Sequence, residues 1–389
     1  MITPRSTFLP IATAVFGPEE KQEMIETLDS GWITLGPRTK KFEEELATYI
    51  GAKYTIALNS ASAALHLAML AIGIGPGDEV ITTPFTFAAT ANAILHCGGK
   101  PVFVDIDPQT FNIDASLVES AITPKTKAIL PVHYAGQAVD LDTLSAITKK
   151  HNLYLIEDAA HAIGSTYKGK KIGTIGDLTC FSFHPVKNMT TGDGGAITTD
   201  NQELAEKIMV LRVNGMDKES WKRNTSTGSW DYAIVAEGFK YHMNDISAAL
   251  GIHQLRKLDR FLQVRKDVAA AYDKAFAKIP EVTIPYRSNS LEHAFNIYAI
   301  LLDTSKLTTS RNDVINKLKE YNVGSIVYYR PLHLQPFFQE SLGVKEGDFP
   351  NTEFVFERLI CLPMYHGMTP EDAKYVVDVL QEIIASNKK

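Results

Sequence analysis

One lysine of this chain lies in an unusual local setting. The apolar run 180–183 ends at His184-Pro185, which is typical of a strand that stops at a turn. Lys187 follows in a short polar loop, and three glycines within 192–195 then allow the backbone to fold back closely. Inside a pocket, such an amine could lose its proton and form a Schiff base with an aldehyde. Taken alone, an ordinary surface lysine is the more frequent case.

Two further features lie where predicted strands end. Asp158 leaves the end of the apolar run 153–158. A carboxylate there is costly unless it meets a positive partner, either a protonated pyridine nitrogen or a structural arginine. The turn 59–64 carries Ser60 and Ser62 ahead of a predicted helix, so its amides and hydroxyls suit a phosphate. Plain capping of the helix by either serine is the alternative.

Together these features indicate one cofactor. A phosphate-binding turn, a strand-end aspartate and a loop lysine are the groups that pyridoxal phosphate requires. The lysine binds the aldehyde, the aspartate keeps the ring nitrogen protonated, and the turn holds the phosphate. No single feature is specific, but the combination is.

The segments between these residues alternate between short apolar strands and amphipathic helices. This alternation predicts a largely parallel sheet covered by helices on both faces. Ligands of such sheets bind at the carboxyl ends of the strands, so the three features should converge. The expected strands are 54–58, 79–83, 101–105, 127–132 and 153–158, and the expected helices are 62–72, 88–96, 114–121 and 141–151.

The rest of the chain predicts a second, smaller unit. At 389 residues, the chain is longer than one core usually supports. We expect a large domain with an N-terminal arm at 1–255 and a small α+β domain at 256–389. Further expected elements are helices at 18–30, 39–50, 201–213, 244–277, 311–321 and 370–385, a long irregular loop at 214–240, and strands at 295–302 and 324–328.

Composition excludes several classes of function. A net charge of -6 and the absence of a dense basic block argue against a nucleic-acid partner. No run approaches the ~18 apolar residues that a membrane span needs. The three cysteines (97, 180 and 361) have neither metal-ligand spacing nor a disulfide framework, so no metal site is expected and a reducing, cytoplasmic location is the default.

Several motifs resemble the DegT/DnrJ/EryC1/StrS family of sugar aminotransferases, over essentially the whole chain. The family has the α/β fold of PLP-dependent transferases of fold type I, which is aspartate aminotransferase-like. The resemblance implies a homodimer that makes amino sugars from nucleotide-linked keto sugars. Within the family, the chain is most similar to the C4 enzymes of the UDP-4-amino-4-deoxy-L-arabinose aminotransferase type. The motifs are Gly-Trp-Ile-Thr-Leu-Gly-Pro (31–37), Pro-Val-His-Tyr-Ala-Gly (131–136), Glu-Asp-Ala-Ala-His-Ala (157–162), Ser-Phe-His-Pro-Val-Lys (182–187), Gly-Asp-Gly-Gly (192–195), Gly-Phe-Lys-Tyr-His-Met-Asn-Asp (238–245), Asp-Ile-Ser-Ala-Ala-Leu-Gly (245–251) and Leu-Pro-Met-Tyr (362–365).

The resemblance also implies residue roles. Lys187 is then the cofactor lysine and proton shuttle, and Asp158 the partner of the pyridine nitrogen. Lys240 would complete the phosphate site from the partner subunit, at a position where many members have asparagine. His333 matches a histidine near the sugar, with a loop histidine bonded to backbone as the alternative. The remaining implied cofactor contacts are Phe87 stacked on the ring, Ala61, Ser62 and Ser182 at the phosphate, and His161 near the ring hydroxyl.

The implied reaction is a two-stage transamination. L-Glutamate would convert the cofactor to pyridoxamine phosphate, which then aminates the 4-keto group of a UDP- or dTDP-linked sugar. Three alternatives stay open: a 3-keto-sugar aminotransferase, a pyridoxamine-phosphate-dependent deoxysugar dehydratase, and a catalytically silent regulator or sensor. Dehydratase relatives have histidine in place of the lysine, so Lys187 argues against that reading.

Overall fold

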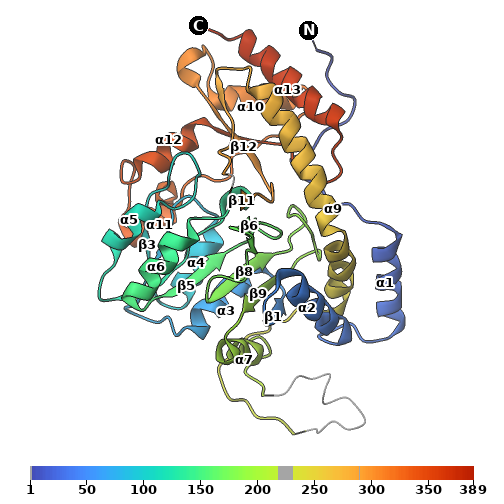
Figure 1. Cartoon of the computed structure of the whole chain (residues 1–389), viewed down its shortest axis with the longest axis vertical. Helices are drawn as coiled ribbons and strands as arrows, with labels where there is room; N and C mark the ends of the chain where they lie inside the picture. The colour runs from blue at the N-terminus through green and yellow to red at the C-terminus, as the bar shows by residue number, and fades with distance from the viewer. Residues whose placement is uncertain (1, 218–230, 289) are drawn as a thin grey trace.

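A seven-stranded sheet forms the centre of the larger part of the molecule (Figure 1). The computed structural model describes residues 2–217, 231–288 and 290–389. Strands β3, β2, β4, β5 and β8 pair in parallel, while β9 runs antiparallel to both of its neighbours. This arrangement confirms the predicted, largely parallel sheet. In spatial order the strands are β1 (Tyr54–Leu58), β9 (Gly195–Thr199), β8 (Leu178–Ser182), β5 (Tyr154–Asp158), β4 (Thr126–Ile129), β2 (Glu79–Thr82) and β3 (Lys100–Phe103).

Helices cover both faces of this sheet because the strand side chains alternate between two cores. On β2, for example, Ile81 faces one core and Val80 the other. The first core contains residues of α2 (Pro37–Ile50), α5 (Ala115–Val118), α6 (Leu141–His151) and the first part of α9 (Asp245–Phe276). The opposite core contains residues of α3 (Ala61–Ala71), α4 (Ala88–His96) and α7 (Gln202–Leu211).

The 32-residue helix α9 connects the two parts of the molecule. Leu258 and Leu262 belong to the core of the large sheet, whereas Val268 and Tyr272 belong to a second core. The predicted division at 255/256 therefore falls within one continuous helix. The N-terminal arm also reaches the second core, because Leu9 is buried there. Helix α1 (Pro18–Asp29) packs on α9.

The second core surrounds a three-stranded antiparallel sheet in the order β10-β12-β13. A separate small sheet, ordered β11-β6-β7, pairs a strand that follows α9 in the sequence with two strands of the larger part. The bounds of these elements are β10 (Val282–Thr283), β12 (Tyr298–Leu302), β13 (Leu359–Leu362), β11 (Leu291–Glu292), β6 (Thr166–Tyr167), β7 (Lys170–Lys171), α10 (Arg311–Glu320), α11 (Pro336–Leu342), α12 (Pro350–Arg358) and α13 (Pro370–Ala385).

One predicted strand is wrong. Residues 324–328 form no strand, because Ile326 makes a single bridge to Cys361 and no other residue of this segment forms a bridge. Helices α11 and α12 and strand β13 were not predicted from the sequence. Of the expected loop 214–240, residues 218–230 lie outside the described part of the chain, and the remainder is irregular with isolated bridges. Among the described residues, no helix is long and apolar enough to cross a membrane.

Candidate active site

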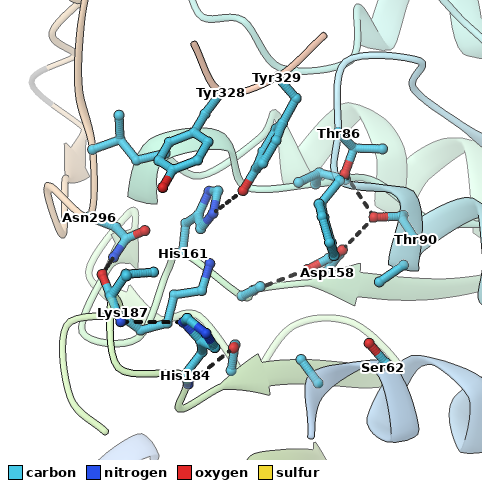
Figure 2. A pocket seen from close by; sticks show the side chains of 18 of the residues that line it. Ser62, Thr86, Thr90, Asp158, His161, His184, Lys187, Asn296, Tyr328 and Tyr329 are labelled. Atoms are coloured by element: carbon cyan, nitrogen blue, oxygen red, sulfur yellow. Dashed lines mark hydrogen bonds between the residues drawn. The ribbon is translucent and has the colours of Figure 1, made fainter. Parts of the chain in front are cut away.

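A cavity of about 370 Å³ opens at the carboxyl ends of β5 and β8. Its floor includes the first turn of α3, and its outer wall comes from the second part of the molecule through Asn296, Tyr328 and Tyr329. Asp158 and Lys187 reach this cavity from neighbouring segments of the large sheet (Figure 2). The parallel topology thus brings together side chains that are far apart in the sequence, as predicted.

Lys187 lies in the loop between β8 and β9 with its side chain in the cavity (Figure 2). Burial lowers the pKa of this amine to about 8, and the negative charge of Asp158 partly opposes that shift. Asn296 holds the loop in place, since its Nδ2 donates to Val186 O at 3.3 Å and to Asn188 Oδ1 at 3.1 Å. Because its pKa is about 8, the Lys187 amine can exist in both protonation states near neutral pH.

Asp158 is buried at the end of β5, with 4% of its surface exposed. Thr90 Oγ1 donates to Oδ2 at 2.8 Å, and the Ala160 amide donates to Oδ1 at 3.1 Å. Thr86 Oγ1 in turn lies 2.7 Å from Thr90 Oγ1. Burial raises the pKa of Asp158, while the Thr90 bond opposes this effect. No arginine bonds this carboxylate among the described residues, so its position suits a cationic ligand group rather than a structural ion pair.

The first turn of α3 provides a place for an anion. Ser60 caps the helix by accepting a hydrogen bond from the Ala63 amide at 3.1 Å. Ser60 therefore caps the helix, and it also lines the cavity together with Ala61, Ser62 and Ser182. A Cβ at Gly195 would lie 2.6 Å from Ala61 N, so glycine is needed for β9 to pass this close to the turn. The helix N-terminus and these hydroxyls form an anion cradle.

Aromatic side chains form the opposite wall. His161 Nε2 lies 3.1 Å from the Tyr329 hydroxyl, and the two rings stack with centroids 6.2 Å apart. Phe87 lies next to Tyr329, with 5.8 Å between ring centroids, and 59% of its surface is exposed. Burial lowers the pKa of His161 well below its ordinary value, so this imidazole is neutral.

Two predicted site residues lie outside the cavity of this chain: His333, and Lys240, which was expected to act on the partner subunit's site. His333 is fully buried, and its Nε2 lies 3.0 Å from Glu353 Oε1. His333 does not line the cavity, and its side chain contacts a carboxylate and Phe349 rather than backbone. Its place near the sugar stays a prediction. Lys240 is exposed outside the cavity, but its carbonyl accepts from Asn59 Nδ2 at 3.2 Å, beside the anion cradle.

The family model for the DegT/DnrJ/EryC1/StrS aminotransferases matches residues 15–381. The chain belongs to this family. It is a PLP-dependent transferase of fold type I, as the sequence motifs predicted. Its cofactor is pyridoxal phosphate, with pyridoxamine phosphate as the aminated form.

Individual relatives match along the full chain. The chain is 49% identical to the uncharacterised protein MJ1066 of Methanocaldococcus jannaschii, over 99% of this chain and 100% of that one. It is 46% identical to the spore coat polysaccharide biosynthesis protein SpsC of Bacillus subtilis, over 99% of each. The PMP-form of the putative sugar aminotransferase Spr1654 from Streptococcus pneumoniae superposes with a TM-score of 0.91 at 35% identity, covering 97% of this chain and 99% of that one. A PLP-form of the same protein superposes with a TM-score of 0.90.

The cavity of this family member fits pyridoxal phosphate. The amine of Lys187 can react with an aldehyde, because burial brings its pKa to about 8. The buried carboxylate of Asp158 fits a protonated pyridine nitrogen, and the α3 cradle fits a phosphate. The Ser62 hydroxyl makes no hydrogen bond within the described part of the chain, so it can serve a phosphate oxygen.

Sequence reasoning missed five residues of this aminotransferase site. Thr86 and Thr90 were detectable in principle, because they follow a predicted strand end and their i, i+4 spacing places both hydroxyls on one side of a helix start. Asn296, Tyr328 and Tyr329 gave no such signal, since they reach the cavity only through the packing of the second part of the molecule.

Proposed function

We propose that this enzyme transfers an amino group from L-glutamate to the 4-keto group of a UDP- or dTDP-linked sugar. The resulting amino sugar would serve the synthesis of a surface polysaccharide or other glycan. The likeness to SpsC and to Spr1654, which are named for polysaccharide biosynthesis and sugar amination, supports a sugar acceptor. The observation that carries the proposal is the buried Lys187 amine, which shares one cavity with the Asp158 carboxylate and the α3 cradle.

The bound cofactor supplies an electron-withdrawing ring and a reactive carbonyl carbon. Asp158 would hold the proton on the ring nitrogen, and Ala61, Ser62 and Ser182 would bind the phosphate. Lys187 would hold the aldehyde and, when released, accept and return a proton at Nζ, a task that a pKa of about 8 suits. Phe87 would cover the ring from the solvent side and exclude water.

We also propose that the active site is completed in a homodimer. Lys240 is exposed, yet its backbone is bonded to Asn59 beside the anion cradle. Its side chain is therefore available to a cradle of a second copy, where its ammonium group would neutralise phosphate charge. Three unpaired cysteines fit a reducing cytoplasm as the site of action.

The other candidate functions have less support. A dehydratase of this fold would not need Lys187 in the cavity, and a silent regulator would not need an amine whose pKa burial brings to about 8. Amination at C3 rather than C4 is the nearest alternative, and substrate measurements separate the two.

The test is a panel of UDP- and dTDP-linked 4-keto and 3-keto sugars, incubated with L-glutamate and the purified protein. We expect 2-oxoglutarate to form together with a 4-amino sugar. Turnover with 3-keto sugars alone would contradict the C4 assignment. A purified protein without a visible cofactor band after addition of pyridoxal phosphate, or with a band that borohydride leaves unchanged, would contradict the aminotransferase assignment itself.

A further inference from the structure

The hydrogen bonds of His161 fix where its single proton lies. The Ala135 amide donates to His161 Nδ1 at 3.3 Å, so Nδ1 is an acceptor and carries no proton. Because burial keeps this imidazole neutral, its proton is on Nε2. Nε2 must then be the donor in the 3.1 Å contact with Tyr329, and the tyrosine oxygen is the acceptor.

This assignment leaves the Tyr329 hydroxyl with a proton of its own to donate. The oxygen already accepts from His161, so its O–H is directed away from the imidazole. Within the described part of the chain, no acceptor for that proton is bonded to Tyr329. Burial raises the pKa of the phenol, which therefore stays protonated. Tyr329 lines the cavity, and its free donor serves whatever the cavity binds.

The position of Tyr329 selects the atom that receives this bond. Lys187, Asp158 and the cradle at Ser62 mark three sides of the cavity, and Tyr329 lies with His161 on the side opposite Ser62 (Figure 2). In pyridoxal phosphate, the ring hydroxyl lies next to the aldehyde carbon, on the edge opposite the phosphate arm. A cofactor held by those three groups therefore presents its ring oxygen to the side where Tyr329 lies.

We propose that Tyr329 donates a hydrogen bond to the ring oxygen of bound pyridoxal phosphate, with His161 orienting the phenol. The proposal rests on the functions proposed above for Lys187 and Asp158. A donor at this point stabilises the ring oxygen as an anion. The hydrogen bond thereby lowers the pKa of the bound cofactor, whose titrating proton is shared between this oxygen and the lysine-bound nitrogen. Tyr329 thus sets the pH range in which the enzyme-bound cofactor is reactive, and His161, which acts through Tyr329, is a positioning residue.

The test is a pH titration of the visible absorption of the holoenzyme. Tyr329→Phe removes only the donor, and the anionic form loses its stabilisation. We expect the pKa of the bound cofactor to rise by about one unit or more, because a hydrogen bond to a charged group is of that size. Replacing Tyr329 by 3-fluorotyrosine makes the phenol a stronger donor and should move the same pKa downward.

Tyr134→Phe is the matched control. The Tyr134 hydroxyl donates to the backbone carbonyl of Tyr328, so it supports the same segment. Its ring lies edge-on to His161 with 6.3 Å between centroids, and Tyr134→Phe keeps that ring and removes only the hydroxyl. We expect the control to leave the cofactor pKa unchanged. An unchanged pKa in Tyr329→Phe, an equal shift in both variants, or an upward shift with 3-fluorotyrosine would each overturn the proposal. Absence of the visible band in the wild-type protein would instead refute the proposed function.

Discussion

Thr90 and Asp158 are joined by a buried 2.8 Å hydrogen bond, although 68 positions separate them in the sequence. Thr90 lies in the first turn of α4 and Asp158 at the end of β5, so the bond connects two neighbouring layers of the α/β unit. It is the largest influence that opposes the rise in the pKa of Asp158 caused by burial. The hydroxyl thereby favours the ionised form of the carboxylate, which a cationic partner requires.

Replacement of Thr90 by valine should weaken cofactor binding. The change keeps the volume but removes the donor, so the pKa of Asp158 should rise further. Loss of a hydrogen bond to a charged group costs about 1.5–3 kcal/mol, and the dissociation constant of pyridoxal phosphate should rise about tenfold or more. Equilibrium titration of the apo protein by absorbance measures this. Thr86 reaches the carboxylate only through Thr90, so Thr86→Val should raise the dissociation constant less. An equal or larger rise would contradict the assignment of Thr90 as the direct donor.

The pH dependence of cofactor capture should follow the ionisation of Lys187. Only the neutral amine attacks the aldehyde, and burial lowers its pKa to about 8. The capture rate should therefore rise with pH, with about 1% of the amine neutral at pH 6 and about half at pH 8. Stopped-flow absorbance measures the profile.

Asp158→Asn should move that capture profile to lower pH. The carboxylate raises the pKa of Lys187, so its loss favours the neutral amine.

Lys187→Ala should abolish capture and turnover and leave the far-ultraviolet circular dichroism unchanged. Retained turnover would show that another lysine binds the cofactor.

Gly195→Ala should impair the anion cradle. The added methyl group would meet backbone atoms of Ser60 and Ala61 at 2.6 Å, and backbone cannot move aside as a flexible side chain can. We expect the turn to shift and the affinity for pyridoxal phosphate to fall about tenfold or more, since roughly 1.4 kcal/mol suffices for that change. Gly75→Ala is the control, because no atom lies within 4 Å of its added Cβ. An unaltered affinity in Gly195→Ala would show that the turn tolerates the displacement.

Arg265 should contribute strongly to stability. This buried guanidinium on α9 donates through Nη1 to the carbonyls of Phe295, Asn296 and Met364 at 3.0, 3.3 and 2.9 Å. Arg265→Gln should lower the free energy of unfolding by about 3 kcal/mol, because buried carbonyls lose their donor. Chemical denaturation measures this change. Arg260→Gln, an exposed position on the same helix, should stay within about 0.5 kcal/mol, and a comparable loss there would contradict the argument.

The sequence alone determined the sheet, its helices and the centre of the site. Strand and helix periodicities are local, and parallel topology forces strand ends to meet at one edge. The shared cavity of Lys187, Asp158 and Ser62 could therefore be predicted. The absence of a strand at 324–328 could not be predicted from the local sequence, because a strand forms only where a partner strand continues the pairing. Here Ile326 pairs with Cys361 at a single residue.

Only the tertiary structure decided which side chains complete the cavity. Tyr329 faces it while His333, four residues later, is buried against Glu353. Nothing in their local sequence separates these two residues, because each orientation depends on contacts with segments far along the chain. The same holds for the bond of Thr90 to Asp158. Local sequence patterns determined the sheet and its helices, and long-range packing determined which hydroxyl groups can donate hydrogen bonds in the cavity.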